Sequence, residues 1–201
     1  SVNEDHKRSI EKGKYARAIH NIAPDVQSTD MPILEATGTA DATGRATLTP
    51  GDVVRFRKEF LAMGISEGED LRLVLNYFHW LDLMQKDEAF LRQYKDMRNG
   101  ELLPLYGFSI YNYGSQPYYF KDTGNDNKWT RRSFGVTPVT GDCLASTAFY
   151  KPCTVQSIGD TKFYWKKAEP REQMNEINYR HYHLAMRKAF DAVGVLLSET
   201  S

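Results

Sequence analysis

The chain has 201 residues, of which 41% are hydrophobic and 12% are aromatic, so it can form a sizeable core and is not a largely disordered protein. Lys and Arg together number 26, as do Asp and Glu, and the formal net charge is therefore zero. Proteins that bind nucleic-acid phosphates usually carry a basic excess, so the composition argues against specific nucleic-acid binding. No segment reaches the roughly 18 consecutive apolar residues of a membrane-spanning helix, so we expect no membrane insertion.

The first predicted element is a helix over residues 4–22. Its apolar residues recur at i, i+3, i+4 and i+7 and form one stripe, which consists of Tyr15, Ala18, Ile19 and Ile22. Lysines and arginines occupy much of the remaining surface, which is typical of a solvated helix face. Residues 24–48 are rich in Thr, Ala, Gly and Asp. We expect them to form a long loop or loose hairpin with its tip between Gly38 and Gly44, and short paired strands around the tip at Ile33, Leu34, Ala46 and Leu48.

A second helix is predicted to start directly after Thr49. Thr49 can cap it, Pro50 suits its first turn, and Asp52 stands three residues after the cap. The helix is expected to end at Gly64. A short strand over residues 71–75 and one amphipathic helix over residues 78–93 follow.

Beyond Asn99-Gly100 the pattern changes from helical to strand-like. Two aromatic runs, residues 102–113 and 117–121, flank Gly114-Ser115-Gln116 and predict a β-hairpin. Residues 122–141 are predicted to be a surface loop. The aromatic block in this region is expected to pack across strands, although an exposed part of it would also suit a binding module.

The last third predicts strands over residues 144–150, 161–166 and 193–197, with one or two helical turns at residues 152–158. Residues 176–188 are ambiguous. Ala185–Phe190 has helical propensity, whereas Ile177, Tyr179, His181 and His183 alternate as strand residues do. The whole order, helices followed by several strands, predicts an α+β fold with mixed strand pairing.

His181 and His183 are the strongest candidate metal ligands. Residues two apart on a strand point to the same side, so both imidazoles could reach one ion. A metal-dependent enzyme built on them is therefore one alternative function. A third ligand would have to come from elsewhere, for example from His6, His20 or His79, and the spacing selects none of them. Two such histidines are more typical of a surface or interface.

Other catalytic patterns are absent from the sequence. It contains no Gly-x-Ser-x-Gly elbow, no phosphate-binding GxxxxGK[ST] loop and no GxGxxG motif. Cys143 and Cys153 form neither a CxxC pair nor a disulfide framework, so we interpret them as reduced thiols that pack as small apolar groups. We therefore predict no catalytic, cofactor-binding or metal-binding residue.

Three segments carry a resemblance to a known family. They are Leu71–Asn76, His79–Met84 and residues 100–111, the last of which includes Gly107-Phe108. Their order resembles that of tailed-phage major capsid proteins of the Hong Kong type, in which a strand ending near "LVL", a helix bearing "DL" and a segment with "GF" follow one another. Residues 49–198 match this order throughout.

The resemblance implies an axial domain, with helices flanking a mixed sheet, and a peripheral domain with a long helix and long antiparallel strands. Residues 1–48 would supply the peripheral helix and a connecting loop, residues 49–158 the axial domain, and residues 159–201 the peripheral strands. It also implies that residues 176–188 form a strand. No part of this chain corresponds to the N-terminal arm and extended loop of the family, and the chain begins at Ser1, so we expect a trimmed product.

The implied function is that of a self-assembling capsid subunit of a phage or prophage, without catalysis or cofactor. Its partners would be copies of itself in hexamers and pentamers, together with scaffold or portal proteins. Its location would be the virion capsid, and the host cytoplasm before assembly. The loop at residues 122–140 is the expected subunit contact.

Overall fold

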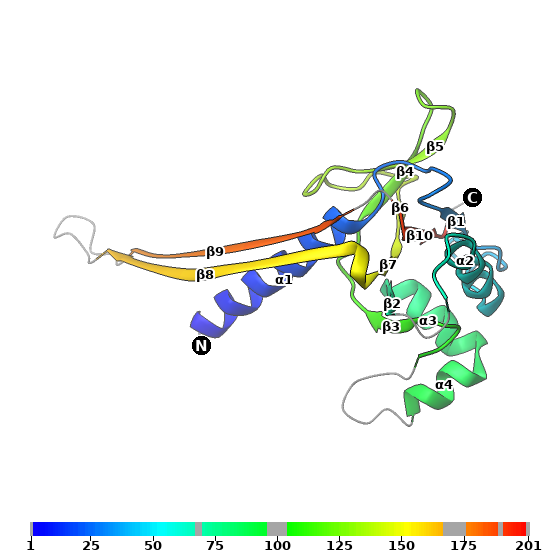
Figure 1. Ribbon diagram of the computed structural model, residues 1–201, viewed down its shortest axis with the longest axis horizontal. Coiled ribbons are helices and arrows are strands. Elements are labelled where there is room, and N and C mark those ends of the chain that lie inside the picture. Colours follow the sequence, from blue (N-terminus) through cyan, green and yellow to red (C-terminus); the bar gives the residue numbers. More distant parts are fainter. Residues whose placement is uncertain (1, 67–69, 96–103, 167–175, 189–190, 200–201) are drawn as a thin grey trace.

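The computed structural model describes residues 2–66, 70–95, 104–166, 176–188 and 191–199. The helices are α1 (Val2–Ile22), α2 (Pro50–Ala62), α3 (Tyr77–Lys86) and α4 (Glu88–Lys95), and a 3-10 turn spans Lys151–Cys153. The strands are β1 (Ile33–Glu35), β2 (Leu71–Leu75), β3 (Ser109–Asn112), β4 (Tyr118–Asp122), β5 (Lys128–Arg131), β6 (Cys143–Leu144), β7 (Ser146–Tyr150), β8 (Thr154–Lys166), β9 (Glu176–Arg187) and β10 (Val193–Leu197). Figure 1 shows a compact body from which β8 and β9 project together.

The strands form three sheets. The central sheet has five strands in the order β1-β10-β7-β2-β3, and its β1–β10 and β2–β3 pairs are parallel while the others are antiparallel. A second sheet has the order β5-β4-β6, and β8 and β9 form a two-stranded antiparallel ribbon. The prediction of an α+β fold with mixed strand pairing is confirmed.

Helix α2 contributes large apolar side chains to the core of the body, on the face that its sequence predicts. The Thr49 hydroxyl accepts the Asp52 N–H at 3.2 Å, and the Asp52 carboxylate accepts the Thr49 N–H at 3.0 Å, which completes a capping box. Phe56 and Phe60 are fully buried, and their ring centroids lie 6.0 and 5.8 Å from that of Phe108. The predicted strand at residues 71–75 and the helical assignment of residues 4–22 are also confirmed.

The single helix predicted over residues 78–93 is wrong, because the chain forms α3 and α4 with a break at Asp87. The Asp87 carboxylate accepts the Ala89 N–H at 2.9 Å and so satisfies a backbone donor at the start of α4. A carboxylate at this position ends one helix and begins the next, which the apolar periodicity alone does not reveal.

The predicted hairpin of residues 102–113 and 117–121 is also wrong. Strand β3 pairs in parallel with β2, whereas β4 pairs with β5 and β6 in the second sheet. The chain at Gly114–Gln116 therefore passes from one sheet to another instead of turning back. The aromatic block is divided between the two sheets and does not form one cross-strand cluster.

Four further expectations need correction. Ile33–Glu35 pairs with β10 and not with residues 46–48, although the hairpin tip exists through an Ala40–Ala46 bridge. The predicted loop at residues 122–141 contains β5. Residues 152–158 hold no α-helix, since β8 begins directly after the 3-10 turn. The strand predicted at residues 144–150 is divided by Ala145 between two sheets, because β6 pairs with β4 and β7 with β2 and β10.

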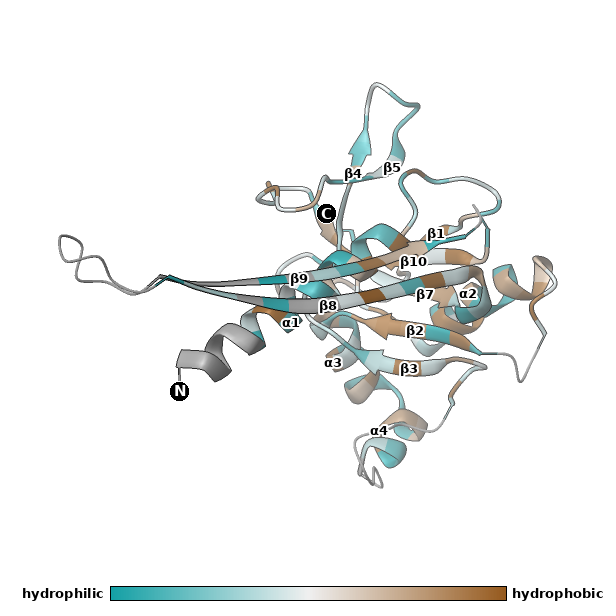
Figure 2. Cartoon of the chain, turned by 60° about the vertical axis from the view of Figure 1, so that its left-hand side comes forward, coloured by the Kyte–Doolittle hydropathy of each residue, from teal (hydrophilic) through white to brown (hydrophobic). Residues whose placement is uncertain are grey.

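Hydrophobic residues concentrate in the central sheet and the helices that cover it (Figure 2). Strand β10 is buried throughout and lies inside that sheet, and the ribbon begins at Thr154. The predicted division at residues 48 and 158 thus falls close to, but not at, the limits of the observed elements. It remains a prediction.

Candidate assembly surface

The ribbon is the most extended part of the molecule. Its register pairs Val155 with Met186 and Ile158 with His183, and then Thr161 with His181, so β8 carries one extra residue in a β-bulge. At Gly159 an added Cβ atom would lie 2.9 Å from the Cβ of Tyr182, so only glycine fits beside this bulge without a shift. The strand predicted at residues 176–188 is confirmed as β9.

Helix α1 covers one face of the ribbon (Figure 1). Ala185 of β9 is 5% exposed on this side. At the base, Arg187 donates to the Ala23 carbonyl oxygen at 2.8 Å, and Arg131 of β5 donates to the same oxygen at 2.6 Å. Both guanidinium groups also pair with the Asp25 carboxylate. These contacts fix the ribbon to the end of α1 and to the second sheet.

The opposite face of the ribbon is apolar and open. Side chains two apart on a strand share a face, and directly paired residues of antiparallel strands lie side by side on it. Four residues, here called the ribbon stripe, share this face: Val155, Tyr182, Leu184 and Met186. They are 39, 53, 47 and 43% exposed. Adjacent exposed apolar side chains of this size are typical of a protein interface.

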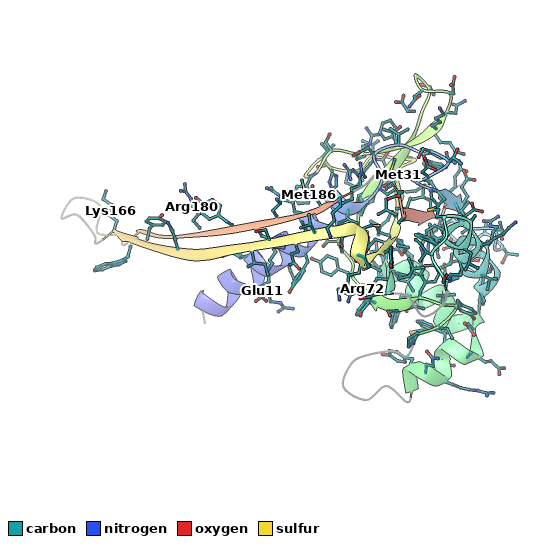
Figure 3. All side chains as sticks on the ribbon, in the orientation of Figure 1. Glu11, Met31, Arg72, Lys166, Arg180 and Met186 are labelled. Atoms are coloured by element: carbon teal, nitrogen blue, oxygen red, sulfur yellow. The ribbon has the colours of Figure 1, made fainter. Side chains whose placement is uncertain are left out.

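The far half of the ribbon adds aromatic and basic groups. Tyr164 and Trp165 are exposed. Lys162, Lys166 and Arg180 are exposed as well, and Arg180 donates to the Tyr182 hydroxyl at 3.2 Å. Figure 3 shows Met186 near the base of the ribbon, Arg180 farther out and Lys166 at the far end. The stripe therefore continues into a cationic, aromatic tip.

The expected contact loop at residues 122–140 contains a second apolar surface. Phe134, Val136 and Val139 are 43, 53 and 58% exposed. The Arg132 guanidinium binds both oxygens of the Asp142 carboxylate, at 2.9 to 3.2 Å, and so closes the base of this loop. Phe134 packs edge-on against His20, with centroids 5.4 Å apart. The loop thus exposes three apolar side chains, while the ion pair of Arg132 and Asp142 holds its two ends together.

The candidate metal ligands lie on the ribbon, and no third ligand joins them among the side chains that the structure describes. His181 and His183 lie two residues apart on β9, and the His183 Nε2 lies 3.0 Å from the Gln156 Nε2. The side chains of His181 and His6 fall outside the described residues. Across the part of the chain that the structure describes, no three His, Cys, Asp or Glu side chains converge as a metal site requires. Neither Cys143 nor Cys153 takes part in a disulfide.

His20 and His79 have structural partners. Burial lowers the pKa of His20, and its Nε2 lies 2.8 Å from the Arg132 carbonyl oxygen. His79 is fully buried, with Nδ1 2.7 Å from the Ser146 hydroxyl and Nε2 2.8 Å from the Ser198 hydroxyl. The Ser146 oxygen also accepts the Asn76 N–H, so the same hydroxyl joins His79 to the start of α3.

Burial also lowers the pKa of His79 to about 4, so its imidazole is neutral at pH 7. Through its two serine partners it joins α3 to β7 and to the residue after β10. The role of His79 is therefore to hold elements of the body together. In the sequence this residue is recognisable only as a histidine within a predicted amphipathic helix.

Sequence reasoning missed the ribbon stripe. The alternation of Tyr182, Leu184 and Met186 is visible in the sequence. It overlaps with the alternation of Tyr179, His181 and His183 on the other face, which suggests metal ligands instead of an apolar surface. Val155 has no such signal, because the pattern of residues 152–158 predicts helical turns there and not a strand.

Comparison with models of protein families finds no match, and neither does comparison with curated proteins. Among solved structures, a chain of Mycobacterium phage Che8 shares the fold, with a TM-score of 0.54 and 11% sequence identity. The alignment covers 97% of this chain and 61% of that chain, so the present chain spans about three fifths of the phage protein's length. The fold is therefore one that a phage protein uses. No helix among the described residues is both long and apolar enough to cross a membrane.

Proposed function

We propose that this chain is a structural subunit of an icosahedral phage or prophage capsid and acts by assembling with copies of itself. Residues 49–158 would form the axial domain near the centre of a capsomer. Residues 1–48 and 159–201 would supply the peripheral helix and strands. The subunit would reside in the host cytoplasm before assembly and in the virion capsid afterwards.

The ribbon stripe is the observation that carries this proposal. α1 covers one side of the ribbon and leaves Val155, Tyr182, Leu184 and Met186 exposed on the other. A shell subunit needs broad, weakly polar contacts that repeat around symmetry axes, and it needs no reactive pocket. The likeness to a phage chain supports the class, and the zero formal net charge limits repulsion between packed copies.

The partners in this proposal are copies of the same chain, in hexamers and pentamers, with scaffold or portal proteins as further contacts. The subunit needs no catalytic centre, no cofactor, no membrane and no specific nucleic acid. A metal-dependent enzyme built on His181 and His183 makes the opposite prediction, so stoichiometric zinc or iron in the purified protein would count against the capsid proposal.

Electron microscopy and sedimentation of the full-length gene product test the proposal directly. We expect rings or shells from the unmodified protein. Leu184→Glu places a charge in the middle of the stripe and should raise the concentration needed for assembly at least tenfold. Lys58→Glu is the control, since it places a carboxylate at an exposed site on α2, away from the ribbon. A full-length product that stays monomeric at every concentration tested would contradict the proposal.

A further inference from the structure

A groove with a volume of about 560 Å³ separates α1 from the base of the ribbon. Tyr15, Ala18 and Ile19 of α1 line one wall, and Val74, Phe149 and Ala185 of three different strands line the other. The volume is in the range of sites that bind ligands or peptide side chains. None of these residues belongs to the ribbon stripe, of which only Val155 borders the groove.

The groove lies along the apolar stripe of α1. Ile22, at the end of the helix, is 7% exposed, whereas Tyr15, two turns earlier, is 50% exposed. An amphipathic helix normally buries its whole apolar stripe against its own domain. Here Ile22 is buried, Ala18 and Ile19 are half-buried, and Tyr15 packs edge-on against Tyr113 with centroids 6.3 Å apart. The part of the stripe before Ile22 therefore borders the groove and is only partly covered by the described part of the chain.

The charged groups that line the groove are mostly cationic. They are Arg72, Lys151 and Lys188 against the single carboxylate of Asp70. Asp70 pairs with Arg72 and Lys151, each at 3.0 Å, and its hydrogen bond from Arg72 lowers its pKa, so it stays ionised. Lys188 donates to the Pro152 carbonyl oxygen at 3.1 Å. The lining therefore keeps a positive excess. Figure 3 shows Arg72 at this junction of body and ribbon.

We propose that this groove binds an acidic amphipathic helix of a partner protein other than this chain. Apolar side chains at i, i+3, i+4 and i+7 would fill it, as in other helix-in-groove complexes, and flanking carboxylates would meet Lys151 and Lys188. Helix α2 of a second copy fits less well. The exposed apolar residues of α2, Val54 and Leu61, are flanked by Arg55 and Lys58, and these cations would meet the cationic lining.

Two synthetic peptides of about 18 residues test this inference by fluorescence anisotropy on the whole chain. Both carry Leu at the four anchor positions, and one has Glu where the other has Lys. We expect the Glu peptide to bind at least tenfold more tightly than the Lys peptide, and to weaken as salt is added. The double variant Lys151→Glu, Lys188→Glu should reverse this preference.

The double variant Lys58→Glu, Lys128→Glu is the matched control, because it makes the same charge change on exposed lysines of α2 and β5, which do not line the groove. It should bind both peptides as the unmodified chain does. The inference is overturned if neither peptide binds, if both bind equally, or if the control variant shifts the preference as much. It is also overturned if the groove variant changes only self-association, which would identify a second copy as the occupant. Capsid assembly is scored separately by sedimentation, so failure here leaves the proposed function standing.

Discussion

Arg187 of strand β9 donates a hydrogen bond of 2.8 Å to the carbonyl oxygen of Ala23, the residue that directly follows helix α1. Its side chain is only 10% exposed and also pairs with the Asp25 carboxylate. We expect Arg187→Met to lower the free energy of unfolding by about 2 kcal/mol, since hydrogen bonds of charged groups contribute about that much. Urea denaturation measures this change, and hydrogen exchange should show faster opening at the ribbon base.

Arg180→Met is the control on the same strand. Arg180 is exposed and donates to the Tyr182 hydroxyl beside it on the same strand, so its loss should change stability by less than about 0.5 kcal/mol. Equal losses from the two variants would contradict the anchoring role of Arg187.

Arg45 and Asp82 form a largely buried ion pair, with nitrogen–oxygen distances of 2.8 and 2.9 Å and side chains 11 and 8% exposed. Asp82 also accepts the Leu48 N–H at 2.9 Å. Arg45→Met would leave a buried carboxylate without its cation, which typically costs about 3 to 5 kcal/mol. The measurement is the midpoint of denaturant unfolding.

The exposed pair of Glu88 and Arg92 provides the comparison for that experiment. These side chains are 88 and 79% exposed, so Arg92→Met should cost less than about 0.5 kcal/mol. If Arg45→Met is as mild as Arg92→Met, the buried pair does not stabilise the body as we describe.

Replacement of glycine by alanine should have opposite effects on stability at Gly194 and Gly13. A Cβ atom at Gly194 of β10 would lie 2.8 Å from the Pro32 carbonyl oxygen and 2.9 Å from the Phe56 ring, so Gly194→Ala should cost about 1 to 3 kcal/mol. At Gly13, in the middle of α1, an added Cβ atom would meet no described atom within 4 Å outside the helix's own backbone. Gly13→Ala should therefore stabilise the protein by up to about 1 kcal/mol. Thermal melts of both variants test the pair, and a shift in the same direction would refute it.

His79 should make the protein less stable in acid. Burial lowers its folded-state pKa to about 4, below the value of 6.5 for an unperturbed histidine. The unfolded chain therefore takes up a proton first as the pH falls. The stability contributed by neutral His79 is present above pH 6.5 and is lost as the pH falls to 4, and the total is about 3 kcal/mol.

Urea denaturation at several pH values between 7.5 and 4 measures this loss. His79→Gln removes the titrating group, so the difference between the two proteins should shrink as the pH falls. Carboxylates affect both proteins alike and cancel in that difference. A difference that stays constant with pH would show that His79 does not titrate as we expect.

Local signals in the sequence were sufficient for parts of this fold. The capping residues Thr49 and Asp52 define the start of α2, and the spacing of Phe56 and Phe60 defines its buried face. Pairing between distant segments had no local signal. The parallel pair of β1 and β10 joins residues 162 positions apart, such as Ile33 and Val195. The chain at Gly114–Gln116 leaves one sheet for another where its composition is typical of a turn. The ribbon stripe depends on the pairing of Val155 with Met186, for which the sequence contains no local signal.

Strand β10 lies between β1 and β7, with Val195 beside Ile33 on one side and Thr147 on the other. A ribosome completes β1 and β7 long before it reaches β10, and it must first make the whole ribbon. Until then β1 has no strand to pair with, and one edge of β7 stays open. The nascent body therefore exposes an unfinished sheet for the time that these last segments take to emerge, at roughly 5 to 20 residues per second. Over that interval a chaperone would have its best opportunity to bind.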